Sequence, residues 1–155
     1  MIGNEDTVEG LLSDLIKLDY DAAEAYEAAI NRLDDNQYKT RLREFRQDHL
    51  NHTKNLGDIL RQMKKNVPQG PDAMRLLTQG KVVLADLLGD ISILKAMKSN
   101  EDQTNKAYET ALTHKEVTPE IRKTLQQNLQ DERRHREWII EQIEIAEAED
   151  ASEEE

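Results

Sequence analysis

Two strings decide the fold of this chain: Gln47-Asp48-His49-Leu50-Asn51-His52 and Gln130-Asp131-Glu132-Arg133-Arg134-His135. They contain three of its four histidines, and each follows an Ala-Tyr-Glu string, Ala25-Tyr26-Glu27 or Ala107-Tyr108-Glu109, at nearly the same distance. We infer an internal duplication, in which a helix with an acid and a tyrosine precedes a helix with a paired ligand motif. Four-helix bundles assemble two-metal sites in this way, from side chains on facing helices.

The composition predicts a single soluble, helix-rich domain. The chain has 155 residues, enough to bury a core, and its 34% of charged residues, three prolines and six glycines are typical of long helices with few turns. The absence of cysteine excludes disulfides, thiol catalysis and zinc–thiolate or rubredoxin-type iron sites. No nucleophile motif, phosphate loop or dinucleotide motif is present, which argues against those enzyme classes.

Charge and hydropathy restrict the partners and the location that we expect. A net charge of −11 repels nucleic acid and anionic membrane surfaces, so neither is an expected partner. The first residues lack the basic and apolar regions of a signal peptide, and no apolar run approaches the roughly 18 residues of a membrane span. We therefore expect a cytoplasmic protein whose partners are metal ions.

Apolar periodicity predicts four long helices and one shorter helix, and no convincing β-strand. The expected N-terminal caps are Asp6, the Asp34-Asp35-Asn36 cluster, Asp90, and Thr118 followed by Pro119. The long helices are expected at about 6–33, 37–65, 91–114 and 119–148, and the short one at about 73–88.

The loop lengths predict how these helices are connected. Short loops within each half make two antiparallel hairpins, and the Pro/Gly-rich stretch that opens the segment Val67 to Leu88 makes the crossover between them. An all-α four-helix bundle with one long crossover has the ferritin-like topology. We expect the domain to span residues 6–148, with 149–155 as a disordered acidic tail.

Ionisable residues interrupt the apolar stripe of every predicted long helix. In a bundle the core-facing positions recur at alternating steps of three and four residues. These steps place six ionisable residues inside, at one level of the bundle, namely Asp19, His49, His52, Glu101, Glu132 and His135. Buried carboxylates must be paired, neutralised or bound to metal, and three acids with three imidazoles suit a divalent transition metal. The alternative is a metal-free hydrogen-bond network that fixes helix register.

These residues resemble the ferritin-like superfamily, which includes ferritin, bacterioferritin and rubrerythrin. In that family a ligand acid precedes a tyrosine by seven residues on helices 1 and 3, as Glu101 precedes Tyr108 and Asp19 precedes Tyr26. Helices 2 and 4 each carry Glu-x-x-His, which Glu132 and His135 match. The chain is most similar to an uncharacterised bacterial branch described as a ferritin-like domain of unknown function.

The chain departs from the family pattern at two positions. Asp19 is one methylene shorter than the usual glutamate, and His49 occupies the position of a bridging glutamate. Only three acids therefore lie on the stripes, where a di-iron centre has four. Glu27 and Glu109 lie one residue beyond the stripe, where a solvated flank is the more common role. The side chains of Asp48 and Asp131 can accept hydrogen bonds from the imidazoles or face solvent, and the sequence does not decide between these.

The resemblance implies a function in iron handling or the oxidative-stress response. Iron, in a mononuclear or di-iron site, is the implied cofactor, with manganese or zinc as alternatives. The competing hypothesis is a metal-free interaction or structural module with a polar core. His114 is expected to cap the C-terminus of its helix. Trp138 lies off the apolar stripe and can mark an oligomer contact, so a homodimer is one possible oligomeric state.

Overall fold

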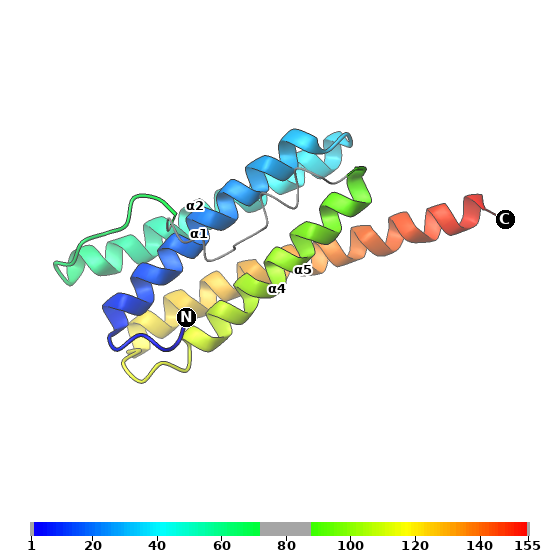
Figure 1. Ribbon diagram of the computed structural model, residues 1–155. Helices are drawn as coiled ribbons and strands as arrows, with labels where there is room; N and C mark the ends of the chain where they lie inside the picture. Colours follow the sequence, from blue (N-terminus) through cyan, green and yellow to red (C-terminus); the bar gives the residue numbers. More distant parts are fainter. Residues whose placement is uncertain (1, 72–87, 155) are drawn as a thin grey trace.

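The computed structural model describes residues 2–71 and 88–154 (Figure 1). Within these ranges the chain forms an all-α four-helix bundle without strands, as the periodicity predicts. The helices are α1 (Val8–Arg32), α2 (Asn36–Gln62), α4 (Asp90–Ala111) and α5 (Pro119–Glu153).

The helices form two antiparallel pairs, α1 with α2 and α4 with α5 (Figure 1). α2 and α4 run in the same direction, because their C-terminal ends pack into one apolar cluster and their N-terminal ends into another. The end of α2 and the start of α4 therefore lie at opposite ends of the bundle, as a long crossover requires. The expected crossover at 67–88 and its short helix at 73–88 fall largely on residues 72–87, outside the described ranges.

The apolar core is divided into two clusters by a layer of buried polar residues. The first cluster packs Leu12 and Leu15 of α1 against residues such as Leu56 and Leu125. The second packs the other half of α1 against Phe45, Leu94 and Ile139, among others. Both clusters provide the burial that drives folding, and the polar layer between them lies at mid-height in the bundle.

Two N-caps differ from those predicted. Thr7, not Asp6, caps α1, and its hydroxyl accepts a hydrogen bond from the Gly10 amide at 3.1 Å. Gly89 caps α4, with a φ of 86° that favours glycine. Asp90 is instead the first helical residue, and its carboxylate accepts hydrogen bonds from the loop between α1 and α2. The caps at Asp35 and at Thr118 with Pro119 are confirmed.

The helix ends also differ from the predicted ones. α2 ends at Gln62 and α4 at Ala111, each about three residues before the predicted end, whereas α5 continues past Ala148 to Glu153. That end of α5 projects beyond the other helices (Figure 1) and is exposed, although Glu147 pairs with Lys95 of α4 at 2.7 Å. Among the helices of the described ranges, none is long and apolar enough to cross a bilayer.

Candidate metal centre

All six residues predicted to face the core do so. Their exposed fractions are 0–1%, and they come from all four helices to meet in the polar layer between the apolar clusters. Each helix contributes at least one of them, because the alternating three- and four-residue steps keep one stripe of each helix directed inward. They are Asp19, His49, His52, Glu101, Glu132 and His135.

The first group of potential ligands lies on the α1–α2 side of the layer. Asp19 Oδ1 lies 2.8 Å from Nδ1 of His49 and 3.2 Å from Nδ1 of His52. Oε1 of Glu132 lies 3.3 Å from the same two nitrogens. One ligand atom from each of these four residues lies within 4.8 Å of the others, a spacing that can hold a metal ion.

The second group lies on the α4–α5 side and shares His49 and Glu132 with the first. Oε1 of Glu101 lies 3.3 Å from Nε2 of His49 and 3.3 Å from Nδ1 of His135. Oε2 of Glu132 lies 3.7 Å from Nδ1 of His135. Glu132 thus directs one oxygen towards each group, and His49 directs one ring nitrogen towards each.

Two buried atoms of the site have no hydrogen-bond partner. They are Oε1 of Glu132, on the side of the first group, and Nδ1 of His135, on the side of the second. A buried polar atom without a partner is costly in a folded protein. Both atoms are ordinary ligands of divalent transition metals, so the donor chemistry of the site fits such an ion.

The two outer histidines are held from behind by carboxylates of the opposite half. Nε2 of His52 donates to Asp131 at 2.9 Å, and Nε2 of His135 donates to Asp48 at 2.8 Å. Each contact crosses between α2 and α5 and leaves Nδ1 directed into the centre. The sequence left open whether Asp48 and Asp131 accept hydrogen bonds from the imidazoles or face solvent. In the structure both accept from an imidazole. Carboxylate–histidine pairs of this kind orient the ligands in metal sites.

Glu27 and Glu109 do not join the site. Both side chains are more than half exposed, Glu27 beside Arg46 at 3.9 Å and Glu109 beside Arg133 at 3.8 Å. The solvated role expected for them is confirmed.

The two tyrosines connect the halves reciprocally. Tyr26 of α1 donates its hydroxyl proton to Glu101 of α4, and Tyr108 of α4 donates to Asp19 of α1 at 2.5 Å. Both rings are buried, and burial beside these carboxylates holds both tyrosine pKa values well above the usual range. Both are therefore neutral donors that orient the ligand carboxylates.

The electrostatics of the site stabilise charged imidazoles in the absence of metal. Burial alone would lower the pKa of His49, but the carboxylates of Glu132, Asp19 and Glu101 outweigh it and raise the pKa to about 9. The same opposition raises the pKa of His52 to about 12, mainly through Asp19 and Asp131. In the other direction, the histidines lower the pKa values of Asp19 and Glu101 against the effect of burial.

Several polar residues that complete the layer were not predicted from the sequence. The hydroxyl of Thr104 reaches Glu101 at 3.2 Å and Glu132 at 3.1 Å, and Asn105 bonds to the backbone oxygens of both. Asn128 donates to the Tyr108 hydroxyl at 3.2 Å. Thr104 and Asn105 follow Glu101 at helical steps of three and four, a signal that could have identified them.

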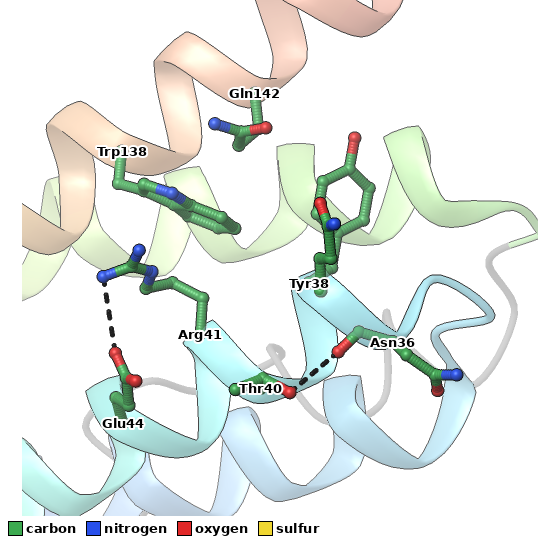
Figure 2. Close-up of a pocket in the computed structure, with 8 residues that line it drawn as sticks. Asn36, Tyr38, Thr40, Arg41, Glu44, Trp138 and Gln142 are labelled. Carbon is green, nitrogen blue, oxygen red and sulfur yellow. Dashed lines mark hydrogen bonds and ion pairs between the residues drawn. The ribbon is translucent and has the colours of Figure 1, made fainter.

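His114 has a role other than the helix cap expected for it. His114 lies beyond α4, where its Nε2 bonds to the Glu5 carbonyl at 2.7 Å and its Nδ1 accepts from the Glu116 amide, so it anchors the N-terminal segment. Trp138 packs on Phe45 and Tyr38. It lines a surface cavity of about 460 Å³ beside Arg41 (Figure 2). Whether this face contacts a second copy stays a prediction.

Comparison with known proteins gives a family and no function. A family model described as "Domain of unknown function (DUF2383)" matches residues 7–114. The matched range includes α1, α2 and α4, and it ends before α5 with Glu132 and His135. No curated protein and no solved structure matches the chain.

Proposed function

The chain belongs to the DUF2383 family, a domain of unknown function, and from its buried polar layer we propose that it binds divalent transition metal inside the bundle, iron before manganese or zinc. The observation that carries the proposal is the pair of overlapping ligand groups that share His49 and Glu132. In this proposal Asp19 and His52 hold one ion, Glu101 and His135 hold a second, and Glu132 lies between the two.

The residues that surround the ligands support this assignment. Each outer histidine donates from Nε2 to a carboxylate, which leaves Nδ1 as the metal-binding atom. Each terminal carboxylate accepts from a tyrosine of the opposite half, which restricts its orientation. Mixed imidazole and carboxylate ligands favour iron, manganese or zinc over calcium or magnesium.

The ferritin-like resemblance extends the proposal from metal binding to a role. Residues Glu101 with Tyr108, and Glu132 with His135, match the pattern of that superfamily. We propose on this basis that the protein handles iron, or acts in the oxidative-stress response, by taking up Fe(II) within the bundle. His49 in place of a bridging carboxylate leaves the site with less negative charge than four acids would supply. A site with one firmly held ion and a second, weaker position is therefore the expected occupancy.

The metal content of the protein tests this proposal. Protein purified without chelators is analysed for metals, and the melting temperature is measured with Fe(II) under anaerobic conditions, Mn(II) and Zn(II). We expect about one to two ions per chain and a rise in melting temperature with metal. The variant Glu132→Ala should lose both, whereas Glu141→Ala, which removes an exposed acid from the same helix, should keep both. Less than about a tenth of an ion per chain, without a thermal shift, would refute the proposal.

A second candidate function is a metal-free structural module. Three carboxylates and three imidazoles can balance one another's charge without metal. The raised pKa values of His49 and His52 and the lowered pKa of Asp19 favour such ion pairs. Such a network can fix helix register and partner orientation without metal. It predicts that Glu132→Ala combined with His135→Ala changes stability or oligomeric state. It also predicts that added metal leaves the melting temperature of wild type and of the double variant unchanged.

A further inference from the structure

A continuous chain of polar contacts crosses the seam between α2 and α5. Nη2 of Arg134 lies 2.8 Å from Oδ2 of Asp48 and 3.0 Å from Oδ1 of Asp131. Asp48 in turn accepts from His135, and Asp131 accepts from His52. One guanidinium nitrogen therefore joins the two carboxylates that hold the outer histidines of the site.

Among the described side chains that bond to the site residues, those in this seam are the most exposed. The partners of the site residues on the other sides are buried, including both tyrosines, Thr104 and Asn105. Among the side chains described above as bonded to the site, Asp48 and Asp131 alone are appreciably exposed, at 23% and 37%. Arg134 is 51% exposed, whereas the histidines directly beneath are at most 1% exposed. Here the two aspartates and Arg134 lie between the outer imidazole rings and solvent.

We propose that metal ions enter the bundle through this seam and that Arg134 gates their passage. The proposal rests on the proposed metal-binding function. The two aspartates attract cations and contact the two outer histidines, while the Arg134 guanidinium pairs with both carboxylates and repels an incoming divalent ion. When the Arg134 side chain swings into solvent, it uncovers the two carboxylates to the entering ion.

The surroundings of Arg134 allow this motion. The side chain is half exposed, and exposed side chains change rotamer in picoseconds to nanoseconds. Partly exposed ion pairs of this kind contribute little to stability, so breaking both contacts need not disturb the fold. The gate is present once in the duplicated chain. The matching position after Asp48 is Asn51, whose amide oxygen accepts from Gln47 on the same helix.

The neighbouring Arg133 provides a matched control. It has the same charge, is 56% exposed and lies one residue away on α5. Its partner is Glu109, which is outside the site. Arg133→Ala therefore removes one positive charge from the same helix without opening the seam, and any general effect of net charge appears in both variants.

The kinetics of metal uptake test the gate. Metal-free wild type, Arg134→Ala, Arg134→Lys and Arg133→Ala are mixed with Co(II) in a stopped-flow instrument. Uptake is followed by quenching of Trp138, the sole tryptophan, whose neighbour Phe45 stacks on His135 at 4.2 Å. Release is measured by mixing the loaded proteins with a chelator, and elemental analysis gives the occupancy. We expect Arg134→Ala to accelerate uptake by about tenfold, the low end of charge-focusing effects, and to accelerate release as well.

The pattern across variants separates a gate from a structural residue. Arg134→Lys keeps the charge and should remain near wild type, as should Arg133→Ala. A residue that only orients the histidines would change release and melting temperature but not uptake. Equal uptake rates in wild type and Arg134→Ala, or equal acceleration in Arg133→Ala, with full occupancy, would overturn the gate and leave the metal site intact. No Co(II), Fe(II) or Zn(II) bound by any of the proteins would overturn the metal site and the gate together.

Discussion

At the scale of single residues, His49 is where the two halves of the site differ most. The duplication pairs Asp19 with Glu101, His52 with His135 and Asp48 with Asp131. In each half the acid lies beside Nδ1 of the outer histidine, and each of the two further aspartates accepts from Nε2 of the outer histidine of the other half. His49 corresponds to Glu132, so a base occupies one of the two central positions and an acid the other. Its ring lies between carboxylates of both groups, where its positive charge can take the place of a second metal ion.

Replacing His49 with glutamate should therefore have opposite effects with and without metal. Without metal, the variant puts a fourth acid beside Asp19, Glu101 and Glu132, and we expect a loss of about 3 kcal/mol or more near neutral pH. With Fe(II), the added carboxylate should strengthen occupancy of both positions and raise the melting temperature above that of metal-loaded wild type. Thermal melts under the two conditions measure both effects. Gln47→Glu adds one carboxylate on the exposed face of α2 and is the control. Melting temperatures equal to wild type under both conditions would mean that His49 is outside the site.

The Tyr108 hydroxyl should contribute to stability through Asp19. Tyr108→Phe removes the donor to Oδ2 of Asp19 and leaves that buried oxygen without its partner. We expect a loss of roughly 1–3 kcal/mol in the free energy of unfolding, measured by urea denaturation. Tyr20→Phe, at a partly exposed position of α1, should change it by less than about 0.5 kcal/mol. Equal effects of the two substitutions would contradict the role assigned to Tyr108.

The six central residues were predictable because their positions depend on local periodicity alone. Asp48 and Asp131 were not, since each lies at the edge of its stripe. Whether an edge carboxylate turns inward depends on what the opposite helix presents, and here it is the imidazole of the other half. The role of Arg134 was not predictable from the sequence for the same reason. Its role depends on two aspartates that come together only after α2 and α5 have packed.

At the scale of elements, the caps show which helix boundaries are determined by neighbouring residues in the sequence. Asp35 and Thr118 cap α2 and α5 through their own following amides, and both were predictable from the sequence. Thr7 caps α1 in place of the predicted Asp6, in an N-terminal segment that His114 anchors through the Glu5 carbonyl. The extra length of α5 has a local reason in its alanine and glutamate content and a non-local one in the Lys95–Glu147 pair.

Asp90 fastens the second hairpin to the loop of the first. Its carboxylate accepts from the amides of Asp34 and Asp35 at 2.8 and 2.9 Å, across 55 residues or more of sequence. Asp90→Ala should therefore lower the free energy of unfolding by about 1 kcal/mol, as expected for partly exposed hydrogen bonds to a charged group. Urea denaturation measures the change. Asp58→Ala, whose partner Arg61 is on the same exposed helix face, should have an effect under about 0.5 kcal/mol. If both variants unfold alike, Asp90 does not connect the hairpins.

At the scale of the whole molecule, the proposed function makes protons and metal ions compete for one buried layer. The net charge of −11 favours cations throughout, and the layer concentrates three acids with two further aspartates around three imidazoles. Without metal the imidazoles hold protons, as their raised pKa values require. Metal binding needs neutral imidazoles and therefore releases those protons. Under the proposed function, the charge of the duplicated core is balanced by protons in one state and by metal in the other.

This competition predicts that the stability of the metal-free protein and the stabilisation by metal change with pH in opposite directions. His49 and His52 titrate near 6.5 when unfolded, and their pKa values rise to about 9 and about 12 when folded. The stability that each contributes is complete below about pH 6.5. It is lost by about pH 9 for His49 and continues to fall up to about pH 12 for His52, because over these intervals the folded protein holds more protons than the unfolded chain. The aspartates act in the other direction: the pKa of Asp131 falls to about 2, so its contribution is lost only in strong acid.

In chelator, the melting temperature should fall between about pH 6.5 and pH 9, and His52→Gln should flatten that fall. With Zn(II), the gain in melting temperature over the chelated protein should grow over the same interval, because fewer protons oppose the metal. A chelated protein that becomes more stable from neutral to alkaline pH would mean that the imidazoles are neutral in the folded state and that the layer is not balanced by protons.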